Sequence, residues 1–195
     1  MTSNEIEWLI QAQNGDDEAF SNLVTRYQNP VYNLCYRMLG NAQEAEDAAQ
    51  ESFWRAYQAI RRYDRSRPFA TWLLSIAAHF CIDQQRKRRL PTLEIEDWME
   101  EIVPDNTPDP EYTAGQNDEN RLLHQIMAGL NPQDRAALVL RYWYEFSEEE
   151  ISHSLQLSVS AVKSRLHRAR QKMATLYRTE QSAIAERIQN ESPAF

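Results

Sequence analysis

The stretch FSEEEISHSLQLSVSAVKSRLHRARQKM, from Phe146 to Met173, carries the clearest structural signal in the chain. Ser147 followed three residues later by Glu150 is the signature of a capping box, which predicts a short helix running through Leu155. Ser158 is a second N-cap, and a longer helix follows it. Two helices joined by a tight turn predict a helix-turn-helix, whose second helix enters the major groove of DNA.

The second of these helices is basic, with five Lys or Arg and no acid between Ser158 and Met173. Val162, Leu166, Ala169 and Met173 recur at spacings of four, three and four and predict a buried stripe. The opposite face presents donors and cations suited to phosphates and base edges, namely Ser160, Lys163, Ser164, His167, Arg168 and Gln171. The alternative is a solvated basic face on a structural helix, which is the usual meaning of a charge run.

The basic helix contrasts with the charge of the whole chain, which is −8 over 195 residues. Ten acids, four prolines and no Lys or Arg fall in residues 90–120, which predicts an extended, flexible acidic linker. Other cations gather at Arg61–Arg67 and Arg86–Arg89, so a negative total hides local basic surfaces.

Helical periodicity also dominates the part of the chain before the linker. Apolar residues recur at spacings of three and four through Phe20–Leu39, Ala45–Ile60 and Thr71–Arg88, and no strand pattern is present. The predicted fold is all-α, with two small helical domains joined by an acidic, proline-containing linker and a C-terminal helix-turn-helix. The predicted boundaries are a first domain at 1–89, the linker at 90–120, a second domain at 121–179 and a tail at 180–195.

Several functional classes lack sequence support. Four scattered glycines form no phosphate-binding loop, and the four histidines fall in no catalytic or metal-binding pattern. No enzyme activity, cofactor or metal is therefore expected. Cys35 and Cys81 lie within apolar helical patterns and are expected to be reduced core thiols. Without a secretion signal or a membrane-length apolar run, we expect a cytoplasmic protein with no membrane insertion.

The quoted stretch resembles region 4 of bacterial RNA polymerase sigma factors, and LNPQDRAALVLRYWYEFS resembles the segment that leads into it. AFSNLVTRYQNPVYNLCYRMLGNAQEAEDAAQESFWRAY and RPFATWLLSIAAHFCIDQQRKRR are similar to region 2. With two domains and a short linker, the chain resembles the extracytoplasmic-function (ECF) subgroup of the sigma-70 family. That resemblance implies core RNA polymerase and promoter DNA as partners, together with an anti-sigma factor.

The resemblance also implies roles for individual residues. Polymerase binding is implied for Asp47, Gln50, Glu51 and Phe53, although spacing alone favours a solvated acidic strip. Binding of the −10 element is implied for Arg67, Trp72, His79, Arg86, Lys87 and Arg88. Binding of the −35 element is implied for Ser160, Lys163, Ser164, Arg165, His167 and Arg168.

Two of the −10 candidates have a competing structural interpretation. Cationic grooves with stacking side chains hold single-stranded DNA, which suits this segment. Trp72, however, is better explained as a core residue, as is Phe80. His79 is expected to line a pocket for one unpaired base, or else to be a core histidine with a satisfied hydrogen bond.

We therefore predict a transcription initiation factor that directs core RNA polymerase to promoters. The helix-turn-helix would bind −35, and the first domain would melt and bind −10. The first alternative is a stand-alone helix-turn-helix regulator of duplex DNA, which would need no polymerase-binding segment. A catalytic helical protein is a more remote alternative.

Overall fold

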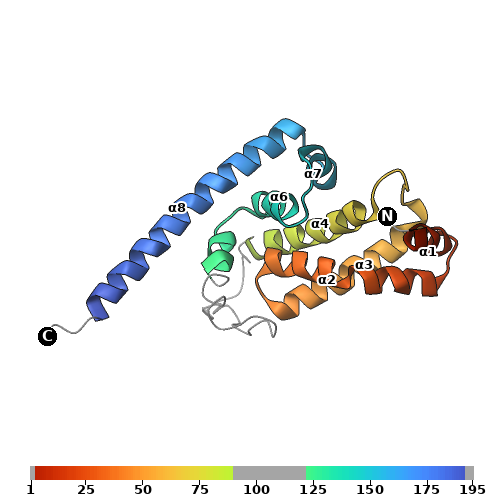
Figure 1. Ribbon diagram of the computed structural model, residues 1–195, viewed down its shortest axis with the longest axis horizontal. Helices are drawn as coiled ribbons and strands as arrows, with labels where there is room; N and C mark the ends of the chain where they lie inside the picture. The colour runs from red at the N-terminus through yellow and green to blue at the C-terminus, as the bar shows by residue number, and fades with distance from the viewer. Residues whose placement is uncertain (1–2, 90–121, 192–195) are drawn as a thin grey trace, which may run out of the picture.

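The computed structural model describes residues 3–89 and 122–191, and every regular element within them is a helix (Figure 1). The all-α prediction is thus confirmed for these residues. The elements are α1 (Ser3–Gln13), α2 (Asp17–Leu39), α3 (Ala42–Ala59), the short 3-10 helix η1 (Ile60–Arg62), α4 (Phe69–Arg89), a helical segment over residues 122–128, α6 (Pro132–Tyr142), α7 (Glu148–Leu155) and α8 (Val159–Glu191). The predicted linker at 90–120 lies outside the described residues.

Helices α1 to α4 form the first domain, in which α2 packs against the other three. The Asp16 side chain accepts the Ala19 N–H at 3.0 Å and caps α2. Gly40, with φ +79°, ends α2 in the left-handed conformation that glycine adopts without steric cost. Asn41 then caps α3 through the Glu44 N–H. These caps fix the sharp turn that sets α2 and α3 side by side.

The second domain contains the predicted helix-turn-helix. Ser147 and Glu150 form both bonds of the capping box at the start of α7, as predicted. Gln156, at φ +55°, ends α7 in the left-handed conformation. Ser158 then accepts the Ala161 N–H at 3.2 Å as α8 begins. Helix α8 runs unbroken across the predicted tail boundary to Glu191, and its C-terminal half extends away from the body in Figure 1.

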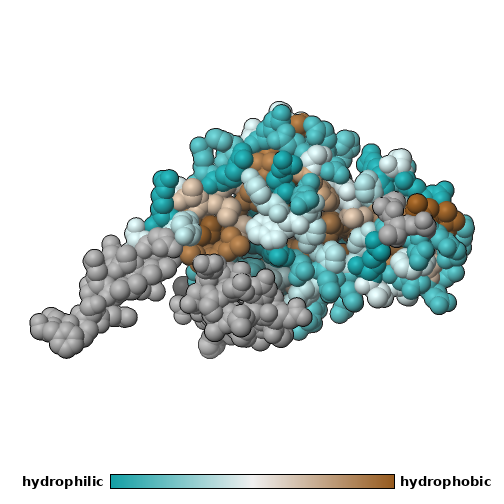
Figure 2. Space-filling view, viewed as in Figure 1, coloured by the Kyte–Doolittle hydropathy of each residue, from teal (hydrophilic) through white to brown (hydrophobic). Residues whose placement is uncertain are grey.

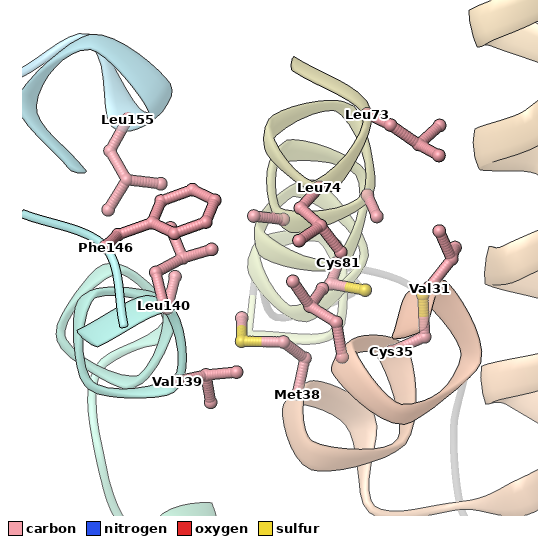
Figure 3. Close-up of a cluster of buried hydrophobic side chains, with 14 of the residues drawn as sticks. Val31, Cys35, Met38, Leu73, Leu74, Cys81, Val139, Leu140, Phe146 and Leu155 are labelled. Carbon is pink, nitrogen blue, oxygen red and sulfur yellow. The ribbon is translucent and has the colours of Figure 1, made fainter. Parts of the chain in front are cut away.

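The two domains pack directly against each other. Helices α6 and α7 lie on α4, and α6 also contacts α2. In Figure 3, Val139, Leu140 and Phe146 face Met38 and Leu74 across this interface, and all five are buried. Since the core is continuous between domains, it resists their separation.

Three polar contacts tie the same interface. The Tyr144 hydroxyl donates to the Pro30 carbonyl at 2.6 Å. The buried Arg135 guanidinium donates to the Met38 carbonyl, near the C-terminal end of α2. The guanidinium of Arg37 lies 5.3 Å from the centroid of the Trp143 ring, within cation–π range. Residues about a hundred positions apart in the chain are thereby joined.

The two cysteines lie between α2 and α4 and are fully buried, as expected of core thiols (Figure 3). A hydrogen bond with the Cys35 thiol, followed by burial, raises the pKa of Cys81. The Cys81 thiol is therefore held neutral. Within residues 3–89 and 122–191, no helix is long and apolar enough to cross a membrane.

Candidate functional surfaces

The basic face of α8 is presented to solvent as the sequence predicts. Val162, Leu166 and Ala169 are buried against the rest of the second domain, whereas Met173, the last member of the predicted stripe, is half-buried. Five of the six −35 candidates are exposed, namely Ser160, Lys163, Ser164, His167 and Arg168. Because the cap fixes the N-terminus of α8, these side chains lie in a row along one defined face of the helix. This is the geometry of a recognition helix.

Acidic residues of α6 and α7 pair with three cations of this face. Lys163 lies 3.4 Å from Glu148, and Arg168 lies 4.0 Å from Asp134, but both cations are more than half exposed. Exposed pairs of this kind contribute little and exchange readily for another anion. Arg165 differs, because it is only 22% exposed and its guanidinium contacts Asp134 at 2.7 Å. Arg165 therefore joins α8 to α6 as well as adding charge.

A second basic surface surrounds the loop before α4. We call residues 61–68 the arginine loop, because Arg61, Arg62, Arg65 and Arg67 are all exposed there. At its base, Tyr63 lies 4.9 Å from Trp72 and 5.4 Å from Phe69, measured between ring centroids. Burial, followed by the charges of Glu5 and Asp64, raises the pKa of Tyr63 to about 12. Its hydroxyl thus stays protonated and donates to the Arg67 carbonyl.

The other −10 candidates lie along α4. Trp72 is half-buried at the edge of the aromatic cluster, so it both packs and presents part of its ring. His79 is half-buried, and its Nδ1 donates to the Ser75 carbonyl at 2.9 Å. The cations at the end of α4, Arg86, Lys87 and Arg88, are exposed, and Arg88 pairs with Glu44 of α3. The structure thus gives His79 a hydrogen-bond partner without enclosing it.

The polymerase-binding candidates lie on α3. Asp47 and Gln50 are exposed, and Glu51 pairs with Arg55 at 2.7 Å. Phe53 is instead half-buried and packs against the core.

The exposed aromatic on the same face is Trp54, at 56% exposure, stacked on Tyr57 at 6.0 Å between ring centroids. Its spacing of seven residues from Asp47 and four from Gln50 places it on that face. Helical phase could therefore have found Trp54 in the sequence. We call Asp47, Gln50, Glu51 and Trp54 the α3 strip.

An apolar groove of about 300 Å³ lies between α6 and α8, lined by Leu138, Tyr142, Trp143, Arg170 and Met173. Figure 2 shows hydrophobic residues gathered where α8 faces the rest of the second domain. Tyr142 is 54% exposed and Trp143 36% exposed at its rim. Such a surface can take up a partner's apolar side chains.

Comparison with known proteins identifies the family of this chain. Sigma-70 region 2 matches residues 23–90, and sigma-70 region 4 matches residues 120–173. The chain is 37% identical to the ECF RNA polymerase sigma factor SigW of Bacillus subtilis over 171 residues, which cover 84% of this chain and 91% of that protein. It belongs to the ECF group of the sigma-70 family. The RNA polymerase sigma-H factor of Pseudomonas aeruginosa is 33% identical over 179 residues, covering 88% of this chain and 93% of that protein.

Family membership establishes the general activity. The chain is a sigma factor, a non-enzymatic initiation factor that binds core RNA polymerase and directs it to promoters. Region 2 binds the −10 element, and region 4 binds the −35 element.

Solved structures share the fold of this sigma factor. CnrH, determined in complex with the cytosolic domain of CnrY, superposes with a TM-score of 0.66 at 24% identity, covering 91% of this chain and 99% of CnrH. RpoE of Bartonella quintana, determined with the anti-sigma factor NepR, gives a TM-score of 0.62 at 19% identity, covering 82% of this chain and 96% of RpoE.

Proposed function

We propose that α8 is the −35 recognition helix and that Ser160, Lys163, Ser164, His167 and Arg168 contact the promoter, with Arg165 positioning α8 and adding positive charge. The observation that carries this assignment is the exposure of these five side chains beside a fully buried stripe. The electrostatic attraction is local, since the overall charge of −8 repels DNA.

The α3 strip is proposed as the main surface for core polymerase. Its two carboxylates and one amide are suited to hydrogen bonds with a partner helix. Trp54 adds the large exposed aromatic that often contributes most to the affinity of a protein interface. Phe53 supports the strip from below through its packing against the core.

The arginine loop and α4 are proposed as the surface for the unpaired −10 strand. Exposed Arg67, Arg86, Lys87 and Arg88 supply charge for the backbone, while Trp72 and His79 supply planar groups for base contacts. We propose that His79 contributes to a base pocket through its second ring nitrogen, because Nδ1 is already engaged with Ser75.

Promoter binding requires the two domains to separate. About 25 base pairs at about 3.4 Å each place −35 and −10 about 85 Å apart, whereas here the domains share one core. We propose that residues 1–89 and 121–179 are the functional domains, that 90–120 is a flexible acidic linker between them, and that polymerase binds the opened form. Residues 180–195 are proposed as a C-terminal extension.

An anti-sigma factor is a further partner proposed for this chain. Both solved relatives named above were determined with partner proteins, and the RpoE partner is an anti-sigma factor. We propose that such a partner binds this sigma factor too, with the groove beside Trp143 as one candidate contact.

Because the core polymerase that this sigma factor binds works on chromosomal DNA, we also propose a cytoplasmic location.

The test of the polymerase surface is co-purification with core polymerase. Asp47→Arg combined with Gln50→Ala should weaken the complex without changing the helical circular-dichroism signal, because both side chains are exposed. Trp54→Ala should also weaken it, whereas Tyr177→Ala, which removes an aromatic of α8 that is 50% exposed, is the matched control. If the Asp47 and Gln50 double variant co-purified with core polymerase as well as the unaltered chain does, the α3 strip would be only a solvated face.

A further inference from the structure

We infer that Gln13 is a positioning residue for −10 opening, because it fixes the arginine loop to the N-terminal helix α1. The inference rests on the proposed −10 role of that loop. Helix α1 lies before the region 2 match, which begins at residue 23.

The Gln13 side chain holds both ends of η1. Its amide nitrogen donates to the Ile60 carbonyl at 3.1 Å and to the Tyr63 carbonyl at 2.8 Å. The Ile60 carbonyl also accepts the Tyr63 N–H, whereas the Tyr63 carbonyl lies past the end of η1, where carbonyls lack intrahelical donors and a side-chain donor is an effective attachment. One side chain of α1 thus sets where the arginine loop leaves the domain.

Beyond these attachment points the loop is ordered by its own contacts. The Asp64 carboxylate accepts the Ser66 N–H at 2.9 Å and the Ser66 hydroxyl at 2.7 Å. The Tyr63 hydroxyl donates to the Arg67 carbonyl, which closes the loop on itself. Loss of the Gln13 bonds would therefore shift the loop as a unit and leave its internal conformation in place.

Helix α1 is itself anchored firmly enough to serve as a reference. Leu9 and Ala12 are buried against the first domain. Glu5 is 2% exposed, accepts the Tyr27 hydroxyl at 2.6 Å and lies 3.6 Å from Arg26. These contacts run to α2, and so they do not depend on the arginine loop.

The loop also contacts the turn that follows α1. A Cβ on Gly15 would lie 3.4 Å from the Arg61 guanidinium, so that side chain passes directly over the turn. Gly15 has φ +95°, which favours glycine. Two features of the α1–α2 connection, the Gln13 amide and the open Gly15 turn, therefore face the same basic loop.

The unpaired strand must be captured as the duplex opens. Displacement of the arginines of this loop should therefore impair promoter melting more than it impairs binding of DNA that is already melted. Gln13→Met removes both donors at nearly constant volume. Gln11→Met is the matched control, since Gln11 lies on the same helix and its side chain hydrogen-bonds only Glu7 among the described residues. Both full-length variants would be assembled with core polymerase and compared on duplex promoters and on templates unpaired across −10.

We expect Gln13→Met to reduce open-complex formation on duplex promoters about tenfold, from two lost hydrogen bonds, with little change on unpaired templates. Polymerase co-purification should equal that of Gln11→Met. Equal losses on both templates, or no difference from Gln11→Met, would overturn the inference. If the unaltered chain opened no promoter with core polymerase, the proposed −10 surface would fail as well, and that result is distinct from a defect confined to Gln13→Met.

Discussion

Replacing Tyr144 by phenylalanine should loosen the contact between the domains by about 1 kcal/mol. The variant removes only the hydroxyl that donates to the Pro30 carbonyl at 2.6 Å and keeps the ring in place. Burial raises the pKa of Tyr144, so the group is a neutral donor at all working pH values. The net value of one such bond is about 1 kcal/mol, which predicts about a fivefold rise in the ratio of open to closed molecules.

The ratio can be measured by single-molecule energy transfer between the domains. Dyes on Glu18→Cys in α2 and Lys172→Cys in α8 would report their separation, since both positions are exposed. The native thiols of Cys35 and Cys81 are 0% exposed and should not take up dye. Added core polymerase should move the population to low transfer efficiency, and Tyr144→Phe should lower the polymerase concentration needed.

Tyr142→Phe is the control for this experiment. It removes the same hydroxyl two residues away, from a side chain that is 54% exposed and contacts Arg170 within the second domain. If Tyr144→Phe opened no more readily than Tyr142→Phe, the hydrogen bond to Pro30 would not be holding the domains together. If the unaltered chain were already fully open, the closed arrangement would have no role in solution.

Three further predictions concern the interface and the two DNA surfaces. Burial, then the charges of Arg37 and Arg135, lowers the pKa of His124, whose ring lies 4.7 Å from Tyr36 across the interface. The closed arrangement of the two domains should therefore be fully favoured above about pH 6.5, and it should weaken as the pH falls through the lowered pKa of His124. The His124→Gln variant should remove this pH dependence in the energy-transfer assay. In a −35 base-substitution scan, Lys163→Ala or Arg168→Ala should lose about 1–3 kcal/mol of binding free energy at particular positions if the replaced side chain contacts bases. The loss should be uniform across positions if that side chain contacts phosphates. Unchanged profiles for both variants would mean that the exposed face of α8 is only solvated. His79→Ala should reduce permanganate-detected melting more on duplex than on premelted templates, whereas equal defects with a lower melting temperature would mark it as a structural residue.

Local sequence signals predicted the helices well. The Ser147–Glu150 capping box, the Ser158 cap and the Val162–Leu166–Ala169 stripe are all found, because each depends on residues within one or two turns of each other. The exposure of most recognition-helix candidates follows from the same periodicity. Arg165 was harder to assign, since its partner Asp134 lies 31 residues earlier on another helix.

Contacts between distant segments were not predictable from periodicity. An apolar residue such as Phe146 is expected to be buried, but the neighbouring sequence does not indicate that it packs against the first domain rather than within the second. The Gln13 attachment joins residues 47 and 50 positions apart and has no local signal. Trp54, by contrast, is identifiable from its helical phase alone, as two turns from Asp47.

Run-off transcription with purified core polymerase on a genomic promoter library shows whether this chain acts as a promoter-specificity factor. The chain should make core polymerase start at a small set of sites that share −35 and −10 elements, and it should produce no specific footprint on the same DNA without polymerase. A specific footprint by the chain alone, with no polymerase-dependent initiation, would exclude this role and favour a stand-alone helix-turn-helix regulator.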